Sequence, residues 1–222
     1  MRQKYKRITH IIIGLTLTAS VLFFLHLNRE YKIKQSRDLH QISRFSPNIL
    51  KANELADARF DFTTLRSLNS VEFLSLDHQE LPTVGSLSIP TLKMELPIYN
   101  GISDENMYFG AGTMRPIQKM GVSNYVIGSH IVPTNNELLF GPLMKIRMKD
   151  KIYLTDLEKT YIYEVDEIKT VNAIKNTDLF DATDEAIVTL ITFNQKGNAH
   201  VIVQGTLQQK VTILDIERPY LN

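Results

Sequence analysis

From residue 83 onward, short runs of β-branched and aromatic residues alternate with turn-forming residues. The runs span residues 84–89, 93–98, 124–128, 151–155, 161–171, 187–193 and 200–207. Turn signals such as Asn100-Gly101 and the segment 181–184 separate them. Seven or eight short strands with few helix-length patterns are typical of a barrel or a sandwich. The sequence therefore predicts an all-β fold with short helices, the latter at residues 114–120 and 138–146.

The last two runs are predicted to form an antiparallel hairpin. They are joined by Asn-Gln-Lys-Gly-Asn at residues 194–198, a connection rich in turn formers. Phe193 closes the first strand and His200 opens the second, so strand pairing brings the two side chains into one neighbourhood. That arrangement would suit a catalytic pair, but a phenyl ring offers no nucleophile and no proton.

Composition sets further limits on function. The chain has 222 residues, 43% of them hydrophobic, and a net charge of +1 at pH 7. These values fit one folded domain with an appendage, and they argue against disorder and against nucleic-acid binding through bulk positive charge. The sequence contains no Cys, which excludes disulfides, thiolate metal sites and a thiol nucleophile.

The N-terminal region reads as a membrane anchor. Residues 1–7 form a basic tail, and residues 8–27 carry no formal charge over a length that can cross a bilayer as a helix. The basic flank predicts a cytoplasmic N-terminus and an extracellular remainder. A cleaved signal peptide is the competing interpretation. The anchor is favoured because the apolar stretch exceeds a signal core and no small-x-small site follows it.

Residues 28–80 are predicted to form a partly helical stem before a β-domain at residues 81–222. Ser46-Pro47 is a plausible helix start, with Pro at the first helical position. Apolar residues then follow at helical spacing as far as Phe60. The segment 52–62 either packs on the following domain or serves as a spacer.

Several short motifs in one order carry a resemblance to a known family. They are GSLSIP (85–90), LPIYNG (96–101), GAGTM (110–114), NYVIGSH (124–130), LFGPL (139–143), DKIYLTD (150–156), YIY (161–163), TLIT (189–192) and VQG (203–205). Each is weak alone, but the ordered series closely resembles the class A sortases over residues 81–207. These are membrane-anchored cysteine transpeptidases that attach surface proteins to the Gram-positive cell wall.

The resemblance implies a closed eight-stranded β-barrel and a three-residue site. In the family, a Cys after Thr-Leu-x-Thr attacks the Thr–Gly bond of a Leu-Pro-x-Thr-Gly sorting signal. A His acts as acid and base, and an Arg on the next strand stabilises the oxyanion or holds the substrate. Position by position, the His falls on His130, the Cys on Phe193 and the Arg on His200.

Two of these three positions are therefore changed. Phe193 cannot form an acyl intermediate, and His200 lacks the permanent charge and the donor fork of a guanidinium. The resemblance thus implies a cell-surface sortase-like protein that is inactive or impaired. Its partners would be the membrane, through residues 8–27, and sorting peptides if the groove survives, with no nucleic acid.

Alternative chemistry stays open at this point. Thr192 matches the family's Thr before Cys, so it could bind a sorting peptide, or replace the nucleophile if His130 activated it. Strand alternation, however, points Thr192 away from the side that Phe193 faces. His130 and His200 could bind a metal only with further ligands, since two fall short of a usual site. Some class A members bind calcium, but no full acidic ligand set can be matched, so neither a metal nor another cofactor is predicted.

Overall fold

The structure is a computed structural model that describes residues 9–10, 12–23, 25–26, 29, 46–62, 65, 81–132, 135–172, 177–194 and 199–213. The chain divides into two compact units, Met1–Arg37 and Asp38–Asn222. Each unit is described by itself below. The predicted basic tail (residues 1–7) and most of the predicted stem between residues 28 and 80 lie outside the described residues.

The first unit contains a helix over residues 12–23, within the predicted span 8–27. Its large apolar side chains are exposed on all sides, among them Leu15, Leu22 and Phe23. Its hydroxyl groups are bonded within the helix. Thr16 donates to the Ile13 carbonyl at 2.9 Å, and Ser20 donates to the Thr16 carbonyl at 2.8 Å. Within the described ranges, no helix combines the length and apolarity required to cross a membrane.

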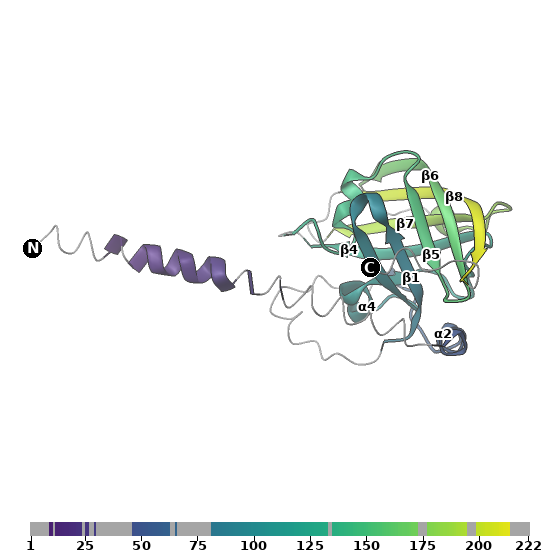
Figure 1. The fold of residues 1–222 in the computed structure, drawn as a ribbon, viewed down its shortest axis with the longest axis horizontal. Helices are drawn as coiled ribbons and strands as arrows, with labels where there is room; N and C mark the ends of the chain where they lie inside the picture. The colour runs from purple at the N-terminus through teal and green to yellow at the C-terminus, as the bar shows by residue number, and fades with distance from the viewer. Residues whose placement is uncertain are drawn as a thin grey trace, which may run out of the picture. The chain divides into compact units, whose positions relative to one another are not determined.

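The second unit is built on a closed barrel of eight strands, as the resemblance implied (Figure 1). The strands are β1 (Thr83–Ile89), β2 (Met94–Tyr99), β3 (Ala111–Thr113), β4 (Asn124–Ile131), β5 (Lys151–Thr155), β6 (Lys159–Val171), β7 (Ile187–Asn194) and β8 (His200–Thr212). They close in the order β1-β2-β3-β4-β7-β8-β6-β5. Most neighbours are antiparallel, but β2 pairs with β3 and β4 pairs with β7 in parallel.

Seven of these strands follow the predicted runs, and β3 does not. Its three residues, Ala-Gly-Thr, have no β-branched alternation to mark them as a strand. The strand forms because small residues allow the backbone to approach closely. A Cβ on Gly112 would lie 2.4 Å from the Gly101 carbonyl oxygen. A side chain at this position would therefore push β3 away from the turn after β2.

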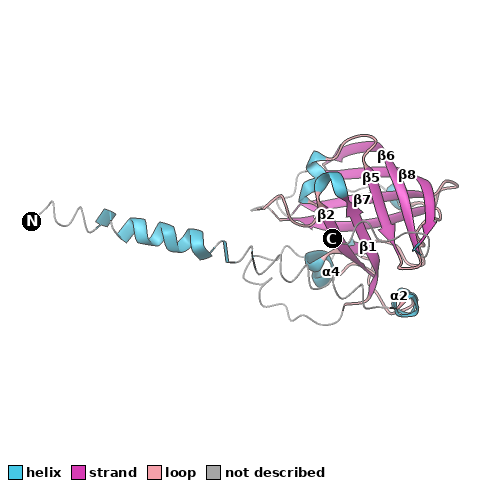
Figure 2. Cartoon of the chain, viewed as in Figure 1, coloured by secondary structure: helices cyan, strands magenta, loops and turns pink. Residues whose placement is uncertain are grey.

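The helices are short and lie at the margins of the barrel (Figure 2). They are α2 (Pro47–Glu54), α4 (Asp104–Phe109) and the 3-10 turns η2 (Pro90–Leu92), η3 (Gly141–Lys145) and η4 (Thr177–Phe180). The predicted helix at 138–146 is present only as η3. Helix α4 was not predicted; Ser103 caps it by accepting a hydrogen bond from the Asn106 N–H at 3.1 Å.

The prediction of a helix at residues 114–120 is wrong. This segment is an irregular turn that leads from β3 to β4. Ile117 has a φ of 55°, in the left-handed region, and its side chain is 95% exposed. Pro116 supplies no N–H for a helical hydrogen bond, and Ile117 points into solvent.

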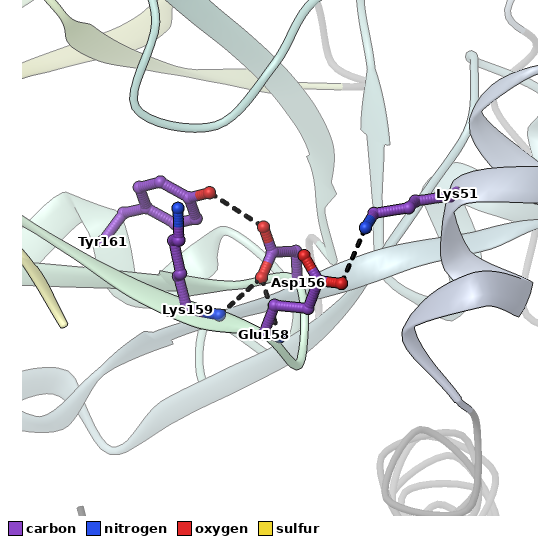
Figure 3. Close-up of polar contacts among 5 residues, drawn as sticks. All are labelled: Lys51, Asp156, Glu158, Lys159 and Tyr161. Carbon is purple, nitrogen blue, oxygen red and sulfur yellow. Dashed lines mark hydrogen bonds and ion pairs between the residues drawn. The ribbon is translucent and has the colours of Figure 1, made fainter. Parts of the chain in front are cut away.

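Helix α2 begins at Pro47, as predicted, and packs on the barrel. Leu50 is buried against it, and the Asn53 side-chain amide donates to the Thr83 carbonyl of β1 at 2.8 Å. Lys51 pairs with Glu158 on the β5–β6 turn at 2.6 Å (Figure 3). In the same view, Asp156 accepts hydrogen bonds from the Tyr161 hydroxyl and the Lys159 N–H, at 2.8 and 2.7 Å, and so shapes that turn. Of the two readings of segment 52–62, the structure shows packing on the domain.

Candidate functional site

The parallel pairing of β4 with β7 places His130 directly beside Phe193. The two ring centroids are 6.5 Å apart in an edge-on arrangement. His200 opens β8, and its ring lies 5.7 Å from that of Phe193, also edge-on. The three positions singled out in the sequence are thus neighbours at one end of adjacent strands, with Phe193 in the middle.

His130 is a buried side chain near the end of β4. It is 4% exposed, and neither ring nitrogen is hydrogen-bonded within the described part of the chain. Tyr108 from α4 covers it, with a ring-centroid distance of 4.8 Å. Burial lowers the pKa of His130 to about 4, and the nearby Phe193 backbone and Asp104 carboxylate oppose this effect only in part. The imidazole is therefore neutral at neutral pH.

Phe193 fills the space beside His130 with an apolar ring. A Cβ on Gly128 would lie 2.7 Å from Cε2 of Phe193 and 2.8 Å from Sδ of Met114, so only glycine leaves room for the ring on β4. Phe193 packs on a cluster of buried apolar side chains. The cluster consists of Ile102, Met107, Met114, Val126 and Ile191, and its other partly buried neighbours are Phe62, Leu65 and Phe180.

Thr192 is fully buried on β7, next to β8. Its hydroxyl oxygen accepts a hydrogen bond from the Val201 N–H at 2.7 Å. Its carbonyl oxygen lies 2.8 Å from Nδ1 of His200. A carbonyl can only accept, so Nδ1 of His200 carries the proton and donates it. Both groups are therefore engaged in holding the β7–β8 hairpin.

The described residues offer no metal centre at this position. No group of three or more His, Asp or Glu side chains that could hold an ion occurs within them. His130 and His200 come from β4 and β8, the two strands that flank β7. The three positions therefore bring together a phenyl ring, the imidazole of His200 and a neutral imidazole, His130, that makes no hydrogen bond among the described residues.

Three further side chains of this region were not predicted from the sequence. Tyr108 covers His130, while Phe62 and Phe180 lie with Phe193 in one row of rings. Tyr108 belongs to α4, whose capping residue Ser103 was a usable signal. Phe62 contacts residues more than a hundred positions away in the chain, and no local periodicity announces such a contact.

Comparisons with known proteins agree with this geometry. The sortase domain family matches residues 87–208. Sortase A of Listeria monocytogenes serovar 1/2a is 34% identical over 194 residues, covering 86% of this chain and 84% of that protein. Sortase A of Streptococcus agalactiae serotype III is 29% identical over 206 residues, covering 90% and 83%.

Solved structures give the same result. Listeria monocytogenes sortase A superposes with a TM-score of 0.55 and 36% identity, over 59% of this chain and 90% of that one. Sortase C-3 of Streptococcus pneumoniae superposes with a TM-score of 0.60 over 81% and 92%, and at 16% identity it supports the fold alone. The barrel, the ordered motifs and these similarities together establish that this chain belongs to the sortase family.

Proposed function

We propose that this chain is a membrane-anchored, sortase-related protein of the cell surface that binds sorting peptides but does not cleave them through a thiol. The observation that carries the proposal is the Phe193 ring at the family's nucleophile position, edge-on to His130. Family membership supports a general role with surface-protein sorting signals. The Leu-Pro-x-Thr-Gly motif itself and the loss of activity are part of the proposal.

The chemical argument concerns the first step of transpeptidation. An acyl-enzyme forms when a nucleophile attacks the scissile carbonyl and gives its proton to a base. His130 is neutral and could accept a proton, but its neighbour across the β4–β7 pair is a phenyl ring. With no Cys in the chain, no thiol can take the place of that ring. The base therefore has no nucleophile to activate.

The two altered-chemistry routes have little structural support. Thr192 is fully buried, and its hydroxyl oxygen already accepts the Val201 N–H. A metal-activated water would require ligands that the described residues do not bring together. At the Arg position, Nδ1 of His200 donates its proton to the Thr192 carbonyl of the same hairpin. The same N–H cannot also stabilise an oxyanion.

The membrane part of the proposal concerns residues 8–27, preceded by the basic residues 1–7. The described helix 12–23 exposes its apolar side chains, and Thr16, Thr18 and Ser20 satisfy their hydroxyls on backbone carbonyls of the same helix. Polar groups bonded in this way are compatible with a lipid environment. The charge distribution favours a cytoplasmic N-terminus in a Gram-positive cell.

The decisive experiment restores the family's residues. The full chain, solubilised in detergent, is compared with a Phe193→Cys, His200→Arg double variant. Both receive a fluorogenic Leu-Pro-x-Thr-Gly peptide, and peptide binding is followed in parallel. We expect a silent parent that binds the peptide and a double variant that cleaves it. Adding His130→Ala to the double variant should abolish the restored cleavage, because the base is then missing.

Other outcomes would overturn parts of the proposal. Cleavage by the parent that His130→Ala removes would establish altered chemistry in its place. A parent that neither binds nor cleaves would show that the fold persists without the peptide-binding role. Membrane anchoring is tested separately by cell fractionation, where deletion of residues 1–27 should move the protein out of the membrane fraction.

A further inference from the structure

Methionine and basic side chains are exposed together on η3 and the residues that follow it. Met144 is 58% exposed and Met148 is 54% exposed. We call residues 144–149 the basic loop, and its exposed cations are Lys145, Arg147 and Lys149. Residues 144–151 hold four basic side chains and one acidic one, while the whole chain has a net charge of only +1. Positive charge is therefore concentrated around two exposed thioethers.

Buried side chains at every third position fix the first half of the basic loop to the barrel. They are Phe140, Leu143 and Ile146, each at most 8% exposed. A 3-10 helix has three residues per turn, so these residues lie on one side and leave Met144 and Lys145 on another. The exposure of Met144 and Lys145 thus follows from the way η3 packs.

The second half of the basic loop is a turn fastened to β6. The Arg147 N–H donates to Oδ2 of Asp150 at 2.8 Å, and the Asp150 N–H donates back to the Arg147 carbonyl at 3.1 Å. The Lys149 N–H donates to the Val165 carbonyl of β6 at 2.8 Å. The exposed side chains are therefore carried by a fixed backbone, and the carboxylate of Asp150 is engaged within the turn.

The charges of the basic loop stay accessible to a partner outside the barrel. Among the residues that the structure describes, no carboxylate forms an ion pair with Lys145, Arg147 or Lys149. Glu164 on β6 pairs with Lys151 at 2.6 Å instead. The pKa of Glu164 is lowered by that hydrogen bond to Lys151 and, to a smaller extent, by the charge of Lys149. This acid is thus matched to Lys151, which leaves the three cations of the loop for an external anion.

This combination of side chains fits the surface of an anionic lipid bilayer. Phosphate headgroups match the cations, and the acyl chains below them provide an apolar phase for the methionines. A soluble polyanion offers only the first of these two contacts. Met is unbranched and flexible, so it inserts between lipid chains without a preformed pocket. The two exposed thioethers therefore favour a lipid surface over a polymer in solution.

We propose that the basic loop is a membrane-contact surface. Met144 and Met148 insert at the headgroup level of an anionic bilayer, while Lys145, Arg147 and Lys149 face its phosphates. The attraction is largely electrostatic, so it weakens when salt screens the charges.

Contact at the basic loop also holds the candidate site close to the membrane. The Phe140 N–H donates to the His130 carbonyl at 3.1 Å, so the segment that leads into η3 is bonded to the strand that carries His130. A bilayer bound at the loop therefore keeps the end of β4, where His130 pairs with Phe193, beside the lipid surface. The use of this position for sorting peptides rests on the proposed function above, whereas the lipid contact does not.

The test uses the absence of Cys from the chain. Met144→Cys in the full chain is labelled with an environment-sensitive nitrobenzoxadiazole group and reconstituted into vesicles of phosphatidylcholine, with or without phosphatidylglycerol. Leu55→Cys on α2 is the matched control, because Leu55 is 88% exposed and follows an acidic residue, Glu54.

The label reports insertion through its emission. In vesicles that contain phosphatidylglycerol, at low salt, the emission at position 144 should rise severalfold and shift to the blue. Lipids with a spin label on the acyl chain should quench it. Neither change is expected in phosphatidylcholine alone or at position 55. Met148→Cys repeats the measurement at the second methionine.

Two sets of substitutions separate charge from folding. Lys145→Gln, Arg147→Gln and Lys149→Gln together remove the charges and keep much of the aliphatic stems. This triple variant should lose the emission increase, because each cation contributes about fivefold to the affinity for an anionic surface. Lys145→Arg, Arg147→Lys and Lys149→Arg together keep the charges and should retain the signal. An increase that survives the loss of all three charges would overturn the electrostatic contact.

Other outcomes decide between the lipid contact and its alternatives. A label at position 144 that stays in water in both kinds of vesicle would overturn the proposal. The same holds if soluble poly(glycerol phosphate) changes its emission and anionic vesicles do not, because the loop then binds a polymer. An alkaline carbonate wash tests the anchor separately. A chain that washes off, although its label responds to anionic vesicles, would overturn the anchoring in the proposed function and leave the lipid contact standing.

Discussion

Two buried polar side chains of this barrel contrast sharply. The Asn100 amide, between β2 and α4, donates to the carbonyls of Asn53, Glu54 and Ala56 at 2.8, 3.3 and 3.0 Å. His130, at the end of β4, is equally buried and makes no hydrogen bond among the described residues. The first side chain ties the residues around the end of α2 to the barrel. The second is neutral because the Phe193 backbone and the Asp104 carboxylate offset the burial of its charge only in part.

The contrast shows which part of the molecule is built for stability. Buried polar groups normally have partners, and an unpartnered one costs free energy. The surroundings of Asn100 follow this rule, because Asn106 and Thr113 also bond the same turn. His130 breaks it, as residues at functional sites often do. Under the proposed assignment, Phe193 stands where the family has a thiol, so the imidazole lies beside a phenyl ring instead.

The largest effect on stability is expected from removing the hydrogen bonds of the Asn100 side chain. Asn100→Ala should lower the free energy of unfolding by about 4 kcal/mol, since several carbonyls near the end of α2 lose their donor at once. Chemical denaturation of the full chain measures the change. Gln208→Ala on the exposed part of β8 is the control and should change stability little. A loss for Asn100→Ala no greater than that of the control would show that water replaces the amide without cost.

The buried His130 predicts that the free energy of unfolding depends on pH. The pKa of His130 is lowered from 6.5 to about 4, so the unfolded chain binds a proton more readily than the folded one. Its contribution to stability is therefore fully present above pH 6.5 and is lost as the pH falls towards 4, by up to about 3 kcal/mol. Unfolding free energies measured between pH 7 and pH 4 should show this slope.

The variant His130→Leu is expected to flatten that slope. It removes the titrating group, and it replaces an unpartnered polar ring by an apolar side chain, so stability at pH 7 should not fall. A variant that keeps the whole slope would assign the pH dependence to other groups. A variant strongly destabilised at pH 7 would mean that the imidazole has a partner beyond the described residues.

A third prediction concerns Phe193, the residue beside His130. Phe193→Cys should raise the pKa of His130 by at least about one unit, because loss of the ring admits water and a thiolate would favour the imidazolium. Titration of the histidine resonances by NMR measures the pKa. Phe193→Ser separates the two causes, since it admits water without an ionisable group. If neither substitution moves the pKa, Phe193 does not set the burial of His130.

The sequence predicted those parts of the fold that local patterns encode. The β-branched runs marked seven strands, and Pro47 marked the start of α2. β3 was missed because its Ala-Gly-Thr sequence depends on the close approach of Gly112 to Gly101, which only the folded barrel requires. The helix predicted at 114–120 does not form, because Pro116 donates no N–H and Ile117 takes a left-handed φ with its side chain in solvent.

The site was predicted from the order of its motifs rather than from its geometry. The resemblance placed His130, Phe193 and His200 at corresponding positions, and the β4–β7 and β7–β8 pairings bring them together. The contact of Phe62 with Phe193 joins residues far apart in sequence, with no pattern in either segment to reveal it. Nor could the sequence show that His130 makes no hydrogen bond among the described residues, because that depends on every element packed around it.

The smallest effect on stability is expected from the exposed ion pair between α2 and the β5–β6 turn. Lys51 and Glu158 approach to 2.6 Å, but their side chains are 59% and 43% exposed. The hydrogen bond to Glu158 raises the pKa of Lys51, yet exposed pairs of this kind add little to stability because water and salt screen them. Lys51→Met, which keeps the aliphatic stem, should therefore leave the unfolding midpoint unchanged within error in high salt and nearly so in low salt. A clear loss in both conditions would mean that the attachment of α2 depends on this ion pair, and not on Leu50 and the amides of Asn53 and Asn100.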